Sequence, residues 1–121
     1  MARFRLSRLA QADLEHVLAA SAERWGSDRR RRYAAILAAA MRKVSADPKG
    51  PATRTRAELA SGLRSFHIQH VRAGDSGAKV IRPVHILYYR AVAPDLIEIV
   101  RVLHERMDPH RHLDEVSEDQ D

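Results

Sequence analysis

The stretch VHILYYRAVAPDLIEIVRVLH, residues 84–104, decides the fold. It contains two runs rich in β-branched and aromatic residues, 84–92 and 96–104, on either side of a turn at Ala93-Pro94-Asp95. Such residues favour strands, and a tight turn between two runs of this kind predicts a hairpin. Because both runs are mostly apolar, we expect them to be the central strands of a sheet, partly buried on both faces.

The segment before this hairpin predicts a third strand. Residues 63–71, LRSFHIQHV, alternate, with Phe66 and Ile68 on one side and polar residues on the other. The cluster Gly74-Asp75-Ser76-Gly77 is typical of turns, so we expect residues 72–83 to form a long, exposed hairpin arm. Residues 48–62, which contain two prolines and two glycines, predict a loop.

The N-terminal part of the chain predicts a short strand followed by two helices. Residues 3–6 alternate polar and apolar, as in a strand with one buried face. Ser7 can cap a helix over residues 8–25, which Gly26 ends, and Ser27 or Asp28 can cap a second helix that stops at Asp47-Pro48. Apolar residues recur at helical spacing in both, and polar residues such as Asp13 are expected to face solvent.

The order of elements predicts an α+β fold, β-α-α-β-β-β, in which an N-terminal helical hairpin packs on one face of an antiparallel sheet. The length of 121 residues suits one domain, which we expect to span residues 1–113. Residues 114–121 hold five of the 16 acidic residues and little apolar content, so we expect a disordered acidic tail.

Composition limits the setting and the partners. Cysteine is absent, and no apolar run is long enough for a secretory signal or a membrane span, so we expect a cytoplasmic protein with no membrane partner. Residues 1–113 carry all 21 basic residues against 11 acidic ones (16 less 5), a formal charge of +10. A body this basic favours an anionic partner, either nucleic acid or an acidic protein segment.

The stretch LYYRAVAPDLIEIVRVLHERMDPHRHL, residues 87–113, resembles the C-terminal signature of ParE-type toxins, in which a YR strand leads into IEIVRVLHxRMDxxRHL. LSRLAQADLEHV at residues 6–17, AERWG at 22–26 and GLRSF at 62–66 are also similar to that family. The chain therefore resembles the RelE/ParE superfamily, and its ParE branch more than its ribonucleases. The resemblance covers nearly the whole chain except residues 72–83 and the acidic tail.

This resemblance implies the toxin of a type II toxin–antitoxin system, neutralised by a ParD-like antitoxin and acting on DNA gyrase to stop replication. We expect the end of the last strand and the residues after it to contact the target: Arg101, His104, Arg106, Met107, Asp108, Arg111, His112 and Leu113. Asp108 could hold Arg111 by a charge-assisted hydrogen bond.

The antitoxin is expected on the helical hairpin, whose outer groove leaves apolar surface that an amphipathic partner helix can cover. An extended antitoxin segment pairing with a free edge of the sheet is a second possibility. The expected contacts on the hairpin are Leu18, Trp25, Tyr33, Ile36, Leu37 and Met41.

An enzymatic alternative is a ribosome-dependent messenger RNA endoribonuclease of the RelE type. RNA cleavage needs a base, a proton donor and positive charge on the phosphate, which Arg64, Arg90 and His104 could supply. The tyrosine that such enzymes usually carry near the C-terminus is missing, because no tyrosine follows Tyr89.

Two further patterns suggest ligands without predicting them. His104, His110 and His112 lie close in sequence, but their spacing and the lack of cysteine are poor for zinc, so we expect neither metal nor cofactor. The run Arg29–Arg32 spans a full helical turn and cannot face one ligand, so direct nucleic-acid binding is not expected from it.

Overall fold

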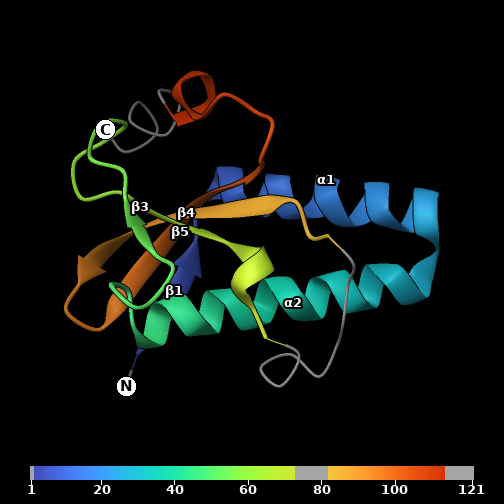
Figure 1. The fold of residues 1–121 in the computed structure, drawn as a ribbon, viewed down its shortest axis with the longest axis horizontal. Helices are drawn as coiled ribbons and strands as arrows, with labels where there is room; N and C mark the ends of the chain where they lie inside the picture. The colour runs from blue at the N-terminus through green and yellow to red at the C-terminus, as the bar shows by residue number, and fades with distance from the viewer. Residues whose placement is uncertain (1, 73–81, 114–121) are drawn as a thin grey trace.

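The computed structural model describes residues 2–72 and 82–113. In it a mixed α+β fold packs two long helices against a five-stranded sheet (Figure 1). The arm expected around residues 73–81 and the acidic tail expected at 114–121 lie outside the described residues.

The central hairpin is confirmed. β4 (His85–Ala93) pairs antiparallel with β5 (Leu96–His104), from His85 opposite His104 to Ala93 opposite Leu96. The strand order β1-β5-β4-β3-β2 places this pair inside the sheet. Side chains on both faces are therefore buried, as the mostly apolar sequence requires.

The third predicted strand is shorter than expected. β3 (Arg64–His67) pairs with β4, and the chain then turns into a 3-10 helix, η1 (Ile68–His70). The alternation misled the prediction because Ile68, which is fully buried in η1, also fits the buried side of a strand. The His67 ring accepts a hydrogen bond from the Gln69 N–H and ends the strand. The predicted loop also contributes a two-residue strand, β2 (Arg54–Thr55), at the sheet edge.

The expectation of an antiparallel sheet is wrong at one edge. β1 (Arg3–Leu6) pairs parallel with β5, from Arg3 opposite Leu96 to Leu6 opposite Ile99. The first helix has to begin where β1 ends, and Ser7 fixes that point by donating its N–H to the Ile99 carbonyl at 3.0 Å and its hydroxyl to the Val100 carbonyl at 2.8 Å. A four-residue pattern carries no information about strand direction.

The two predicted helices form as an antiparallel hairpin (Figure 1). α1 (Arg8–Trp25) is capped by Ser7, whose hydroxyl accepts the Ala10 N–H at 3.0 Å, and it ends at Gly26. α2 (Ser27–Ala46) follows at once, so Gly26, with φ of +90°, also occupies the N-cap position expected of Ser27 or Asp28. Glycine tolerates this φ without the steric cost that a Cβ atom brings.

Side chains pack on both faces of the sheet. On the helix-covered face, α2 buries a long apolar stripe against Phe66, Leu87, Tyr89 and Ile99. The opposite face holds a smaller cluster of Leu63, Tyr88, Val100, Leu103 and Leu113.

The two helices are buried to different extents. Ala10 is the one buried residue described for α1, whose Leu14, Val17 and Leu18 are only partly covered. α1 is thus the outer helix, with apolar surface left over. Neither helix is long and apolar enough to cross a membrane, a finding that covers residues 2–72 and 82–113.

Candidate functional site

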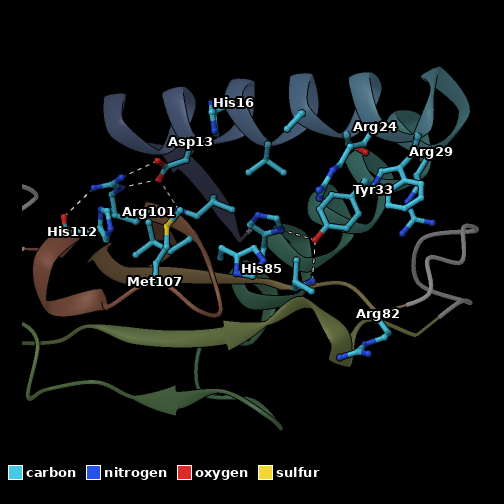
Figure 2. Close-up of a pocket in the computed structure, with 18 residues that line it drawn as sticks. Asp13, His16, Arg24, Arg29, Tyr33, Arg82, His85, Arg101, Met107 and His112 are labelled. Carbon is cyan, nitrogen blue, oxygen red and sulfur yellow. Dashed lines mark hydrogen bonds and ion pairs between the residues drawn. The ribbon is translucent and has the colours of Figure 1, made fainter.

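A groove of about 370 Å³ lies between α1, the start of α2 and the adjoining ends of β4 and β5 (Figure 2). Apolar groups from three elements line it, among them Val17 and Trp25 of α1, Tyr33 of α2 and Val102 of β5. Such a volume falls within the range of ligand-binding clefts. The groove exists because the partly covered side of α1 continues past the short edge strand β1.

Basic residues dominate the groove walls. The lining contains four arginines, Arg24, Arg29, Arg82 and Arg101, against one acid, Asp13, which gives +3 (four less one) before any histidine is counted. Figure 2 shows Asp13 and Arg101 together at one end and Arg24 and Arg29 toward the other. A partner that fills this groove is therefore favoured when its own side chains are acidic and apolar.

A neutral Tyr–His pair forms part of the wall. The Tyr33 hydroxyl lies 2.6 Å from His85 Nδ1 and accepts the Val84 N–H at 3.1 Å. Burial, with added repulsion from His104 and His67, lowers the pKa of His85 from 6.5 to about 4, while burial raises the pKa of Tyr33. His85 is therefore unprotonated at neutral pH, and its Nδ1 can accept a hydrogen bond from the Tyr33 hydroxyl. The pair ties α2 to the start of β4.

The structure divides the residues expected to contact an antitoxin. Trp25, with 60% of its surface exposed, stands at the groove beside Arg29, whose guanidinium lies 4.9 Å from the ring centroid. Leu18 is partly buried, and Tyr33 is buried but lines the groove.

Three of the expected antitoxin contacts are corrected. Ile36, Leu37 and Met41 belong to the core, each at most 5% exposed, so they are not available to a partner. The helical stripe that suggested them is the stripe that packs on the sheet, because α2 and not α1 is the buried helix.

The residues expected to contact the target also separate into two groups. Arg106, Met107, Asp108 and Arg111 are exposed, whereas His104 and His112 are partly exposed. The expectation that Arg101 and Leu113 contact the target is corrected, since they are only 7% and 3% exposed and anchor the segment from inside.

Asp108 has a different role from the one expected. Its carboxylate accepts the His110 N–H at 3.0 Å and its carbonyl accepts the Arg111 N–H at 3.2 Å, so it begins the helical turn at residues 109–113. The expected side-chain bond to Arg111 is replaced by this cap, which satisfies an otherwise unpaired backbone donor.

The residues of the ribonuclease alternative are not brought together. Arg64 lies opposite Tyr89, and His104 lies opposite His85, four residues along β4, a separation of about 13 Å at strand spacing. Arg90 follows Tyr89, so its side chain points to the other face, where it pairs with Glu98 at 3.1 Å. The Arg64 guanidinium is occupied by the Pro48 carbonyl and the Thr53 hydroxyl at 3.0 and 2.9 Å.

The histidine cluster does not form a ligand set in the structure. Among residues 2–72 and 82–113, no group of three or more His, Cys, Asp or Glu residues is placed to hold a metal ion. His104 instead accepts the Arg106 N–H at 3.1 Å through Nδ1.

Sequence reasoning missed two residues of the site. Asp13 was expected to face solvent, but its carboxylate binds Arg101 at 2.8 Å, 88 residues away. In the sequence, His85 is not distinguished from the other residues of its predicted strand. No local pattern identifies either one, because each acquires its role from a partner distant in sequence.

Comparison with known proteins identifies the family. The family model described as the ParE toxin of the type II toxin–antitoxin system parDE matches residues 4–109. The chain belongs to this family. It is accordingly the toxin component of a type II toxin–antitoxin system.

Relatives agree over almost their full lengths. Toxin ParE1 of Mycobacterium tuberculosis (strain ATCC 25618 / H37Rv) is 34% identical over 111 residues, covering 92% of this chain and 97% of that protein. Toxin ParE1 of Caulobacter vibrioides (strain ATCC 19089 / CIP 103742 / CB 15) is 31% identical over 113 residues, covering 93% and 99%.

A solved structure supports the fold of this ParE-family chain. A chain from the chromosomal ParDE toxin–antitoxin system of P. aeruginosa matches with a TM-score of 0.63 at 15% identity, covering 86% of this chain and 95% of that one.

Proposed function

We propose that this ParE-family toxin is neutralised by a ParD-like antitoxin that fills the groove along α1, and that it stops replication by acting on DNA gyrase through residues 104–112. The observation that carries the first half is the groove itself, with apolar walls and four arginines against one aspartate. An amphipathic antitoxin helix with acidic residues on its flanks complements such a surface.

The uncovered state of α1 supports this docking site. Val17 and Leu18 are only partly buried, and Trp25 projects at the end of the helix. Apolar side chains left half covered on an outer helix gain stability when a partner helix covers them, at about 25 cal/mol for each Å² removed from water.

The proposed target surface rests on exposure and on the family signature. Arg106, Met107 and Arg111 lie in the signature stretch and are exposed, and Met107 is 44% exposed. An exposed Met flanked by arginines is a composition typical of protein-binding surfaces. The action on gyrase is inferred from the resemblance to ParE toxins.

Regulated expression in a bacterial host tests the target. DNA, RNA and protein synthesis are followed separately by radiolabel incorporation, and we expect an early fall in DNA synthesis with filamentous cells. An immediate fall in protein synthesis would instead support the ribonuclease, and purified gyrase with relaxed plasmid DNA would then show no effect of the protein.

The working surface is tested with substitutions. Deleting the chain from Met107 onward should abolish toxicity, but it also removes the buried Leu113. A sharper variant is Met107→Ala with Arg111→Ala, which leaves the core intact. We expect loss of growth inhibition, whereas Arg42→Ala on the exposed side of α2 should remain toxic. Full toxicity of the double variant would exclude this surface.

The single tryptophan reports antitoxin binding directly. Trp25 is the one Trp in the sequence, so covering the groove should shift its emission to shorter wavelength. We expect affinity for a ParD-like antitoxin to fall about tenfold between 0.05 and 0.5 M salt, because screening weakens attraction to the arginines. An unchanged emission spectrum on formation of a stable complex would place the antitoxin elsewhere.

A further inference from the structure

Arg101 is a buried cation placed by an irregularity in the sheet. Tyr89 lies opposite Ile99, but Tyr88 lies opposite Arg101, so Val100 is an extra residue in β5. Such a bulge redirects the neighbouring side chains and often re-aims one of them for a specific contact. Here it turns Arg101, 7% exposed, toward α1.

Asp13 of α1 receives this cation with both carboxylate oxygens. Arg101 Nε lies 2.8 Å from Oδ2 and Nη2 lies 2.9 Å from Oδ1, a two-point contact. The same Oδ2 accepts the Val102 N–H at 2.9 Å. This contact covers the part of the β5 edge beyond Leu6, the last residue of β1. Asp13 therefore satisfies a cation and a sheet edge at once.

The third bond of Arg101 reaches the C-terminal segment. Nη1 donates to the His112 carbonyl at 3.0 Å, next to Leu113, whose side chain enters the smaller core cluster. The ion pair thus lies under the turn at residues 109–113, and Figure 2 shows the bonds running from Asp13 through Arg101 to His112.

We propose that Asp13 and Arg101 are a positioning pair that holds residues 104–113 in the arrangement needed to engage the target. This inference rests on the proposed function, in which that segment contacts gyrase. The pair itself does not touch the target, because both side chains are largely buried, at 8% and 14% exposed for Arg101 and Asp13. Neutralising Asp13 removes the charge that Asp13 places against the buried Arg101 guanidinium, which weakens the arrangement in which Arg101 reaches His112.

The test replaces Asp13 by Asn in the full-length chain and measures three properties. We expect the variant to fold by circular dichroism, to be cleaved by trypsin after Arg106 and Arg111 at least tenfold faster, and to inhibit DNA synthesis at least tenfold less. Glu15→Gln, which removes the same charge from an exposed position of α1, should match the wild type in all three.

A second control separates positioning from simple loss of stability. Ser7→Ala removes the bonds to the Val100 carbonyl and the Ala10 N–H at the same junction of α1 with β5, but leaves the bond to His112 in place. We expect this variant to be less stable and still toxic. If Asp13→Asn does not fold, Arg101→Lys carries the test, because it keeps the charge near Asp13 and loses the fork that reaches His112; the same tenfold losses are expected.

The outcomes are distinct. Faster cleavage with undiminished inhibition would overturn the inference, as would cleavage at the wild-type rate. Equal loss of toxicity in Ser7→Ala would also overturn it, because stability alone would then explain the effect. A wild-type chain that never inhibits DNA synthesis would refute the proposed function and with it the inference.

Discussion

As the pH falls, protonation of His85 should destabilise this protein before protonation of its carboxylates does. Burial and the repulsion of His104 and His67 lower the pKa of His85 to about 4 in the folded chain, against 6.5 for the unfolded chain. The unfolded state therefore binds a proton at a higher pH than the folded state does. The stabilisation is complete above pH 6.5, falls as the pH falls, and is lost at about pH 4.

The size of the effect follows from that difference. Lowering the pKa of His85 from 6.5 to about 4 on folding corresponds to a full loss of about 3 kcal/mol in the free energy of unfolding as the pH falls. About 2 kcal/mol of this loss falls between pH 7 and pH 5. The ring is partly exposed, so screening by solvent reduces the expected loss over this interval to about 1 kcal/mol.

Urea unfolding followed by circular dichroism at pH 7, 6 and 5 measures this loss. His85→Asn is the informative variant, because the Asn carbonyl can replace Nδ1 as the acceptor for Tyr33 and cannot take up a proton. We expect the wild type to lose about 1 kcal/mol more than His85→Asn between pH 7 and pH 5. His16→Asn, an exposed histidine of the same groove, serves as the matched control and should follow the wild type. Equal losses in wild type and His85→Asn would refute the reasoning.

Three stability predictions test other parts of the fold. Tyr33→Phe leaves His85 Nδ1 and the Val84 N–H without their partner and should cost about 1–3 kcal/mol in urea unfolding; a neutral effect would mean that water replaces the hydroxyl. Ser7→Ala should cost about 1–2 kcal/mol by the same measurement, whereas the exposed Ser61→Ala should cost nothing, and equal values would contradict the capping role. Phe66→Ala, at a position 1% exposed, should cost about 3–5 kcal/mol in thermal unfolding, and a loss below about 1 kcal/mol would show that the core can collapse around the gap.

Local patterns were sufficient for the elements that alternate or repeat strongly. The hairpin of β4 and β5, both helices, and their limits at Ser7, Gly26 and Asp47 follow from side-chain period and capping chemistry, which act over a few residues. The errors fall where two conformations satisfy the same pattern. Ile68 is buried in η1 and would also fit the buried side of a strand, so an apolar residue at this position could not distinguish the two conformations.

The candidate site, like the fold, could be predicted from the sequence only in part. The terminal signature predicted an exposed surface at Arg106, Met107 and Arg111, and the two amphipathic helices predicted a hairpin with apolar surface left along its outer groove. Which helix is the outer one could not be decided from sequence, because α1 and α2 both carry an apolar stripe. Because α2 is the helix that packs on the sheet, Ile36, Leu37 and Met41 lie in the core and Trp25 lies at the groove.

The sequence by itself determined the order of the two helices and the longer strands, the basic charge of the body and the family, because these depend on residues that are neighbours in the chain. The tertiary structure alone decided that β1 runs parallel to β5, that Arg101 is turned inward by a bulge, and that Asp13 meets it. The physical reason is that the ion pair joins side chains 88 residues apart. Its geometry exists only after the sheet edge, α1 and the C-terminal turn have packed together.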